Sequence, residues 1–367
     1  MPVSTVWSIE PHTAAKHKIL EEYLKAWYPI LSKRNQRILY IDGFAGPGIY
    51  EKGEIGSPIV ALQCLLDHSL ELCQRNREYN FILIEKDKER AEILERTIKE
   101  KFPDIPKNVR IRIYSIDFET AMKSLIAAID KENKSLAPTF AFIDPFGYGG
   151  LPFEIIKRIL GFRSCEVFIN FAYNPINRFI QAEDDPREAT FDELFGTQKW
   201  REIRPIKNPD ERLKRILALY QMQLNTVSKY VKSFEMIDKM SKVSYHLFFA
   251  SNHIDGLSYM KRAMLKVDPR GTFSFSDTTD AGQSFLVSYD ESTKYDDEAD
   301  LLYKNLVGHT LTKKQLEEYC IVHTTFLQLW SSSLKILEDR GKLEFIGTRT
   351  RYGTYPDGCK VKFKEIT

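Results

Sequence analysis

The chain has 367 residues, and 53 Lys and Arg against 51 Asp and Glu give it a formal net charge of +2. Its content of 43% hydrophobic and 12% aromatic residues can fill a sizeable core, which excludes a largely disordered chain. The balanced charge excludes a histone-like protein that is basic throughout, but it leaves open a local basic face. The length predicts about two domains.

The first residues show no charged start followed by an apolar stretch, so we expect no signal peptide. We also expect no membrane span, because no apolar run approaches the length that a bilayer requires. Five widely spaced cysteines without a CxxC pair argue against a disulfide framework or a zinc site, and the seven histidines show no metal-ligand spacing. These features predict a soluble cytoplasmic protein that has no metal site and no membrane partner.

The first half of the chain alternates between apolar helix and strand patterns. Residues 14–31 carry one apolar stripe at helical spacing, with Lys16 and His17 near its start. Ser57 and Pro58 suit the cap and the first turn of a second helix. Strands are expected at 38–41, 81–84, 109–114, 139–143 and 165–171, and later helices at 87–101, 118–130 and 152–160. Five strands that alternate with helices predict a doubly wound α/β sheet.

The alternation of helix and strand patterns ends after residue 171. Residues 174–208 are polar and rich in proline, which favours an insertion over the sheet edge, and a helix is expected at 210–228. Two apolar strands at 230–237 and 243–250 are separated by only five residues. This connection is too short for a helical crossover, so we expect an antiparallel hairpin. A further helix is expected at 256–266.

The C-terminal part differs in charge. Residues 288–300 carry six acids and one lysine and are predicted to be an acidic linker after a domain that spans 1–287. Residues 301–367 hold 11 Lys and Arg against 7 Asp and Glu. Their patterns predict helices at 301–307, 313–320 (capped by Thr312) and 324–340, and strands at 342–348 and 359–364. This order suggests a small winged helix-turn-helix domain.

Acidic residues follow the first four strands, at positions 42, 85, 117 and 144. Ligands of open α/β sheets bind outside the carboxyl ends of the strands, so these residues are site candidates. Glu85 is placed to bind a ribose diol, which would suit either NAD or S-adenosylmethionine. The loop GFAGPG after Asp42 lacks the spacing that binds a pyrophosphate, and Asp42 would repel one, whereas it suits the ammonium group of S-adenosylmethionine. We therefore predict S-adenosylmethionine as the cofactor.

The sequence Asp144-Pro145-Phe146-Gly147 resembles the [DNS]-P-P-[YFW] motif of methyltransferases that act on amino groups of bases, and it is closer still to the form in tRNA guanine-N2 methyltransferases. In that motif the acid and the proline carbonyl accept hydrogen bonds from the exocyclic amino group, and the aromatic ring stacks on the base. Phe146 replaces the second proline, so the motif does not fix the position of its ring. A plain Asp-Pro turn at a strand end is the alternative interpretation.

Several segments, in order, resemble the three-Cys-motif partner protein family (TcmP). The fold of this family is similar to that of class I methyltransferases that depend on S-adenosylmethionine, which have a Rossmann-like sheet. The matching segments are KHKILEEYLKAWYPIL, ILYIDGFAGPGIYEKGEIGSPIVAL, FIDPFG, NFAYNPINRF, LFGTQKW, YHLFFASNH and MKRAM, and the winged-helix tail also fits. The family name refers to a partner that carries three cysteines and is similar to radical-SAM proteins; this chain lacks that motif.

The resemblance implies three groups of site residues. The cofactor group is Asp42, Gly43, Phe44, Ala45, Gly46, Gly48, Glu85, Lys86, Asp117 and Phe118, with the last two at the adenine. Asp144, Pro145 and Phe146 would be catalytic, and Asn170, Tyr173 and Asn174 would line the same mouth. Apart from the resemblance, a winged helix that binds nucleic acid would hold the phosphate backbone with Lys313, Lys314, Arg349, Arg351, Lys360 and Lys362.

Three functions remain open at this point. The chain is predicted to be an N-methyltransferase of a base in RNA or DNA, in which positioning and Asp144 supply most of the catalysis. It could instead be a methyltransferase-like module that binds a nucleoside and delivers substrate to the three-Cys partner. The third function is methylation of a protein or a small molecule.

Overall fold

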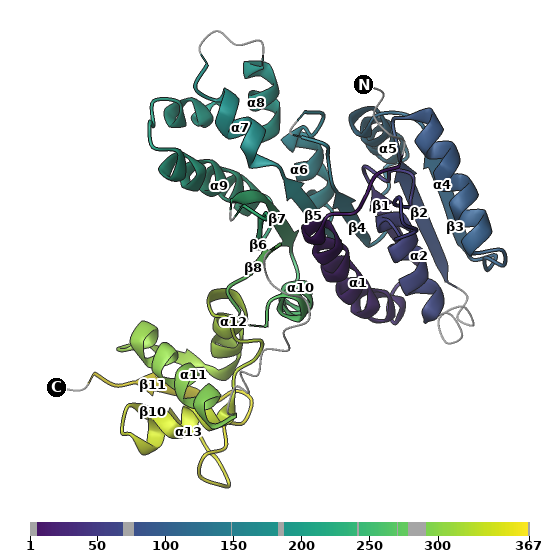
Figure 1. The fold of residues 1–367 in the computed structure, drawn as a ribbon. Coiled ribbons are helices and arrows are strands. Elements are labelled where there is room, and N and C mark those ends of the chain that lie inside the picture. The colour runs from purple at the N-terminus through teal and green to yellow at the C-terminus, as the bar shows by residue number, and fades with distance from the viewer. Residues whose placement is uncertain are drawn as a thin grey trace. The chain divides into compact units, whose positions relative to one another are not determined.

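The computed structural model describes residues 6–68, 77–147, 149–182, 187–240, 242–269, 271–277 and 291–365. The chain divides into two compact units, Met1–Thr279 and Asp280–Thr367, and each is described by itself (Figure 1). Within the described ranges, no helix is both long and apolar enough to cross a membrane.

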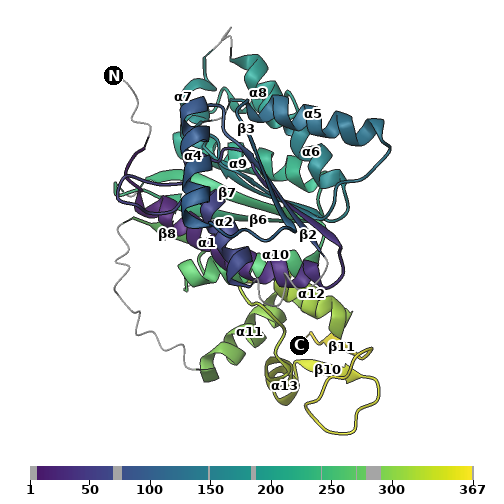
Figure 2. The same cartoon turned by 90° about the vertical axis from the view of Figure 1, so that its right-hand side faces the viewer.

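One eight-stranded sheet forms the centre of the first unit (Figures 1 and 2). Its strands are β1 (Arg37–Asp42), β2 (Glu78–Ile84), β3 (Val109–Tyr114), β4 (Thr139–Ile143), β5 (Cys165–Phe171), β6 (Tyr230–Ile237), β7 (Val243–Ser251) and β8 (Ser274–Ser276). Their order is β3-β2-β1-β4-β5-β7-β6-β8, with β1 to β5 parallel and β7 antiparallel to both neighbours. The predicted Rossmann-like doubly wound sheet and its antiparallel hairpin are confirmed. The strand order reverses between β1 and β4, where such sheets form ligand sites.

Helices cover both faces of this sheet. They are α1 (Pro11–Ser32), α2 (Ser57–Asp67), α4 (Lys88–Lys101), α5 (Phe118–Lys131), α6 (Phe153–Gly161), α7 (Tyr173–Phe179), α8 (Glu188–Phe195), the 3-10 helix η1 (Lys199–Ile203), α9 (Pro209–Asn225) and α10 (Ile254–Val267). The apolar cores place α1, α2, α4 and α10 on one face and α5 to α9 on the other (Figure 2). The residues of β4 and β5 are almost all buried, because both of their faces are covered.

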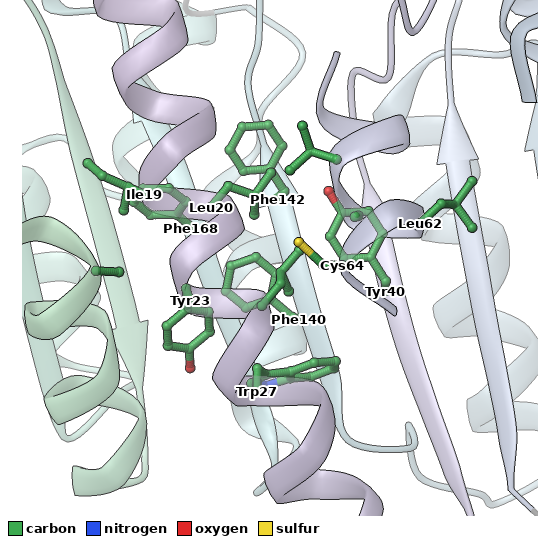
Figure 3. Close-up of a cluster of buried hydrophobic side chains, with 14 of the residues drawn as sticks. Ile19, Leu20, Tyr23, Trp27, Tyr40, Leu62, Cys64, Phe140, Phe142 and Phe168 are labelled. Atoms are coloured by element: carbon green, nitrogen blue, oxygen red, sulfur yellow. The ribbon is translucent and has the colours of Figure 1, made fainter. Parts of the chain in front are cut away.

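An aromatic cluster holds α1 against the middle of the sheet (Figure 3). The Tyr23 ring lies 5.1 Å from that of Phe140 in β4, and Trp27 packs edge-on against the same phenylalanine. Both α1 side chains also donate hydrogen bonds to the buried carboxylate of Glu166, Tyr23 Oη at 2.6 Å and Trp27 Nε1 at 2.9 Å. Ser251 Oγ donates a third, at 2.7 Å. These bonds fix the position of α1 along β5, and hence of every side chain on its first turns.

The first unit differs from the sequence expectation in three places. The segment 174–208 contains three short helices whose apolar side chains, such as Phe195 and Trp200, are buried. The short strand β8 was not predicted, because its parallel partner β6 lies far away in sequence. Ser57 was predicted to cap α2, and this was wrong: Gly56 is the N-cap and Ser57 is the first helical residue.

The second unit contains a separate antiparallel sheet of order β10-β11-β9. Its elements are α11 (Glu291–Leu306), β9 (Thr310–Thr312), α12 (Lys313–His323), α13 (Ser331–Asp339), β10 (Leu343–Ile346) and β11 (Lys360–Phe363). Thr312 caps α12, as predicted. The structure adds that it does so through a capping box with Gln315. The first helix, expected from residue 301, begins at Glu291, and α13 is shorter than the helix expected at 324–340.

Residues 291–300 are therefore helical rather than a linker, while 288–290 lie outside the described residues. Two facts explain why this acidic stretch folds. Ala299 and Glu298 are fully buried, and Glu298 accepts a hydrogen bond from the backbone N–H of Trp330. Arg340 forms ion pairs with Asp296 at 2.6 Å and Asp300 at 2.8 Å, so part of the acidic charge is neutralised within the unit.

Candidate functional site

Asp42, the last residue of β1, is completely buried inside the loop that follows it. Its carboxylate accepts hydrogen bonds from Tyr40 Oη at 3.2 Å, from the backbone N–H of Phe44 at 3.3 Å, and from Ser57. Burial raises the pKa of Asp42 to about 7, and the negative charge of Asp144 adds to the shift. Asp42 is absent from the walls of the two cavities described below, so its observed contacts support the loop. Its contact with a ligand ammonium stays a prediction.

The glycine loop lies between β1 and α2 and requires glycine at particular positions. Gly46 and Gly48 have φ values of +62° and +74°. A Cβ atom on Gly48 would lie 2.6 Å from Leu94 Cδ1, and one on Gly43 would lie 2.8 Å from the Phe118 ring. The loop thus brings backbone close to neighbouring elements, which only glycine allows.

Glu85 directly follows β2 and is 5% exposed. It accepts hydrogen bonds from the N–H of Gly46 at 2.9 Å and of Asp87 at 2.8 Å, one on each carboxylate oxygen. Each oxygen keeps a second lone pair. Glu85 faces a cavity of about 640 Å³, here named cavity A, which is lined by Gly43, Phe44, Glu85, Lys86, Asp87, Arg90, Ile116, Asp117, Phe118, Phe146, Gly149 and Gly150.

Asp117 and Phe118 form the far wall of cavity A. Asp117 caps α5 by accepting hydrogen bonds from the N–H and Oγ1 of Thr120, and the backbone bond in particular lowers its pKa. The Phe118 ring is 2% exposed and lies 5.4 Å from the Phe44 ring in a stacked arrangement. Phe118 is therefore a largely buried part of the cavity lining, and its stacking on adenine stays a prediction.

A second cavity of about 210 Å³, cavity B, lies at the carboxyl ends of β1, β4 and β5. Its lining includes Trp7, His12, Thr13, Lys16, His17, Phe44, Ala45, Gly46, Gly48, Tyr50, Ser57, Asp144, Pro145, Phe146, Asn170 and Tyr245. Phe44 and Phe146 line both cavities, so A and B adjoin. The structure thus brings together most of the residues predicted for the cofactor with all three residues predicted to be catalytic.

Asp144 is held by two partners at the edge of cavity B. Lys16 Nζ lies 2.5 Å from Oδ2, and Asn170 Nδ2 donates to Oδ1 at 2.6 Å. The Lys16 side chain is 4% exposed and that of Asp144 is 21% exposed. Lys16 also lies 5.3 Å from the centre of the Tyr245 ring. The site therefore contains a nearly buried ion pair whose carboxylate keeps one lone pair on each oxygen.

His17 is buried beside Lys16, and its Nδ1 has no hydrogen-bond partner among the described residues. Burial lowers the pKa of His17 to about 3, and the adjacent Lys16 charge adds to the shift. The imidazole is therefore neutral at physiological pH and sits 5.8 Å from the Tyr50 ring.

Phe146 is 72% exposed although it belongs to the predicted motif. Its ring contacts Trp7 edge-on at 5.4 Å, and the Arg90 guanidinium lies 5.8 Å from it and 4.9 Å from Trp7. Gly147 next to it has a φ of +111°, which turns the chain sharply after the motif. An exposed aromatic ring at the junction of two cavities is available to contact a ligand.

The three residues that were predicted to line the opening of the site after β5 separate into two groups. Asn170 joins the site through Asp144. Tyr173 is buried in the apolar core, and Asn174 donates hydrogen bonds to the carbonyls of Val243 and Ser244. Tyr173 and Asn174 thus attach α7 to the sheet and do not line cavity A or B.

The predicted basic residues of the second unit also separate. Arg349 pairs with Glu338 through two bonds of 2.8 and 2.6 Å, and Lys313 pairs with Asp357 at 2.9 Å. The remaining four are exposed and, in the described part of the chain, have no ion-pair partner; they are Lys314, Arg351, Lys360 and Lys362.

Sequence reasoning missed several residues of cavity B. Trp7 and His12 come from a segment that carries no motif, and Tyr245 lies in the segment YHLFFASNH, where no role was assigned to it. Arg90, on a charged helix, was likewise missed for cavity A. Lys16 and His17 were noted only for their place at the start of a helix. The spacing of His12 and Lys16, four residues apart on one helix face, was the one available signal. No group of three or more His, Cys, Asp or Glu residues that could hold a metal ion occurs in the described ranges.

No protein-family model matches the chain, and no curated protein does either. Among solved structures, Trm1 from Pyrococcus horikoshii in complex with S-adenosyl-L-methionine is similar at 13% identity and a TM-score of 0.38, over 70% of this chain and 60% of that one. Human methyltransferase-like protein 13 in complex with SAH is similar at 11% identity and a TM-score of 0.36, over 68% of this chain and 91% of that one. SAH-bound methyltransferase PaMTH1 from Podospora anserina is similar at 10% identity and a TM-score of 0.30, over 68% of this chain and 91% of that one. Likeness of this degree assigns no chemistry to this chain, and the predicted membership in the TcmP family stays a prediction.

Proposed function

We propose that this chain is a methyltransferase that uses S-adenosylmethionine to methylate an amino group of a nucleic-acid base. The observation that carries the proposal is the place of Asp144-Pro145-Phe146 at the carboxyl end of β4, where all three line cavity B and Phe146 also lines the adjoining cavity A. One cavity offers the groups that a nucleoside needs, and the other offers the groups that an amino acceptor needs.

Cavity A fits a nucleoside. Glu85 presents two carboxylate oxygens with spare lone pairs at the position where a ribose diol donates hydrogen bonds in such folds. Gly43 also lines this cavity, and Asp117 can accept from an amino group. Glu85 adds negative charge beside the loop, which suits a cationic ligand better than a pyrophosphate. Bound there, S-adenosylmethionine supplies an electrophilic methyl group on a positively charged sulfur.

Cavity B fits an amino acceptor. Each oxygen of Asp144 can accept one hydrogen bond in addition to those from Lys16 and Asn170. These two partners fix the carboxylate, so it can orient an amino group and stabilise positive charge that develops on its nitrogen. The Pro145 carbonyl already accepts from the N–H of Gly147 at 2.9 Å, so Asp144 is the stronger acceptor. The exposed Phe146 ring is suited to stack on a base.

The second unit offers a surface for the substrate. Lys360 and Lys362 alternate with buried residues along β11, so both point to the same exposed face. With Lys314 and Arg351 they form the basic group that would contact phosphates of RNA or DNA. Three helices and a small antiparallel sheet suit the predicted winged helix, although Arg349 is already neutralised by Glu338.

The first test is cofactor binding. We expect the full chain to bind S-adenosylmethionine in a calorimetric titration, and Glu85→Gln to weaken binding at least tenfold through the loss of charged hydrogen bonds to the ribose. Glu92→Gln, on the exposed side of α4, is the matched control and should bind normally. Absence of binding by the unaltered chain would refute the proposal.

The second test is methyl transfer from radiolabelled S-adenosylmethionine to total RNA and to genomic DNA. Label should enter one nucleic acid, and Asp144→Ala should reduce it at least a hundredfold. Binding without transfer to either would favour a module that serves a three-Cys partner, or a protein or small-molecule acceptor.

A further inference from the structure

We propose that His12, held by Asp277, is the proton acceptor of cavity B and removes the proton that the acceptor group must lose on methylation. This inference rests on the proposed methyltransferase function and adds a residue pair that no sequence motif marks. His12 and Asp277 are 265 positions apart and meet only in the folded chain.

The histidine is held in one orientation. His12 Nδ1 lies 2.9 Å from Asp277 Oδ2, and the two side chains are 17% and 2% exposed. The Tyr245 ring packs edge-on against the imidazole at 5.4 Å, and Tyr245 Oη donates to the His12 carbonyl at 3.1 Å. With Nδ1 engaged, Nε2 is the ring nitrogen that can take a proton in the cavity, and no described residue bonds to it. Asp277 Oδ1 is buried and has no hydrogen-bond partner among the described residues. The side-chain hydrogen bond of this carboxylate is therefore the one that Oδ2 makes with His12 Nδ1.

His12 lines cavity B together with Asp144-Pro145-Phe146. It is four residues before Lys16 on α1, so the two side chains share a helix face. Both contact the Tyr245 ring, His12 by its imidazole and Lys16 by its ammonium at 5.3 Å. Lys16 in turn pairs with Asp144. An acceptor held by Asp144 therefore occupies the cavity that His12 also lines.

The other acids and bases nearby are poorly suited to the task. Protonation of Asp144 would break its ion pair and leave the buried Lys16 ammonium without a counter-charge. Burial lowers the pKa of His17 to about 3, so it does not hold a proton near neutral pH. Asp42 does not line the cavity, and burial raises the pKa of Tyr50 and Tyr245, so both phenols stay protonated. His12, with a carboxylate behind it, is the base that remains.

The step balances as follows. The acceptor nitrogen gives its lone pair to the methyl carbon, and the sulfur keeps the electron pair of the bond that breaks. The N–H proton of the methylated nitrogen passes to His12 Nε2, and its electron pair stays on nitrogen. The Asp277 carboxylate stabilises the imidazolium, in the way a carboxylate fixes the tautomer of a catalytic histidine. The proton then leaves to water through the exposed part of the ring.

One test needs no activity. Nitrogen NMR of the imidazole side chains in the labelled full chain, recorded at a pH at which the His12 ring is neutral, should show its proton on Nδ1, and Asp277→Asn should disturb that tautomer. A neutral His12 that carries its proton on Nε2 would overturn the proposal, because such a nitrogen cannot accept another. This result is independent of whether the chain methylates RNA or DNA, so it separates the failure of this inference from that of the proposed function.

The second test is kinetic and uses the nucleic acid that takes label. We expect His12→Gln to lower kcat about a hundredfold while S-adenosylmethionine binding is unchanged, since general bases contribute about 10²–10⁴ to rates. His309→Gln, at an exposed histidine of the second unit, is the control. Full activity of His12→Gln would overturn the proposal.

Discussion

The Lys16–Asp144 ion pair should respond unequally to loss of its two members. Lys16→Met removes a charge whose partner is 21% exposed and keeps the bond from Asn170, so water and the amide can stabilise the remaining carboxylate. Asp144→Asn instead leaves an ammonium that is 4% exposed and has no other described carboxylate at salt-bridge distance. Breaking a buried ion pair costs about 3–5 kcal/mol when the charge that remains cannot reach water. We expect that range for Asp144→Asn and about 1–2 kcal/mol for Lys16→Met.

Urea unfolding of the full chain at neutral pH measures this difference. Three of the four tryptophans lie in the first unit, so their fluorescence reports mainly on that unit. The double variant Lys16→Met with Asp144→Asn should be more stable than Asp144→Asn alone, because it leaves no buried charge unpaired. A larger loss of stability for Lys16→Met than for Asp144→Asn, or strictly additive effects in the double variant, would show that the two charges are not coupled as the structure places them.

Four further predictions concern the glycine loop, the buried Asp42 and His17, and the second unit. Gly48→Ala should cost about 2–4 kcal/mol in urea unfolding, since it adds a contact at 2.6 Å to a strained φ, whereas Gly53→Ala, with a similar φ and open space, should cost about 1 kcal/mol. Because the pKa of Asp42 is raised to about 7, the native state binds the extra proton and stability falls as pH rises from about 4 to 7; Asp42→Asn should abolish this fall in the melting temperature. The pKa of His17 is lowered to about 3, so its contribution is lost as pH falls from about 6.5 to 3, and His17→Gln should abolish that loss. If the second unit binds nucleic acid, replacing Lys360 and Lys362 by Gln should lower the salt slope of binding by about two, and an unchanged slope would exclude both from the interface.

The sheet and the polar strand ends could be predicted because both depend on local sequence. Strands buried on two faces appear as continuous apolar runs, and the topology then brings the residues after them to one edge. That is why Glu85 and Asp144 were found. The role of Ser57 was misread, because a serine before a helical proline suits an N-cap, while its hydrogen bond to Asp42 depends on how β1 and α2 pack. The start of α11 was predicted at residue 301 and not at 291 for the same reason. The acids of its first turns bind partners such as Arg340, which lies some 40 residues away in sequence.

The wall of cavity B could not be predicted, because it depends on where α1 rests on the sheet. Tyr23 and Trp27 bind the buried Glu166 near the start of β5, and this contact sets the helix at one position along the strands. Lys16, about two turns before Tyr23, then reaches Asp144 at the opposite end of the sheet, and His12 lies one turn beyond it. The apolar stripe of α1 in the sequence identifies a packed helix and says nothing of this register. The same helix therefore closes the core with its apolar face and supplies the ammonium and the imidazole of the candidate site with its first turns.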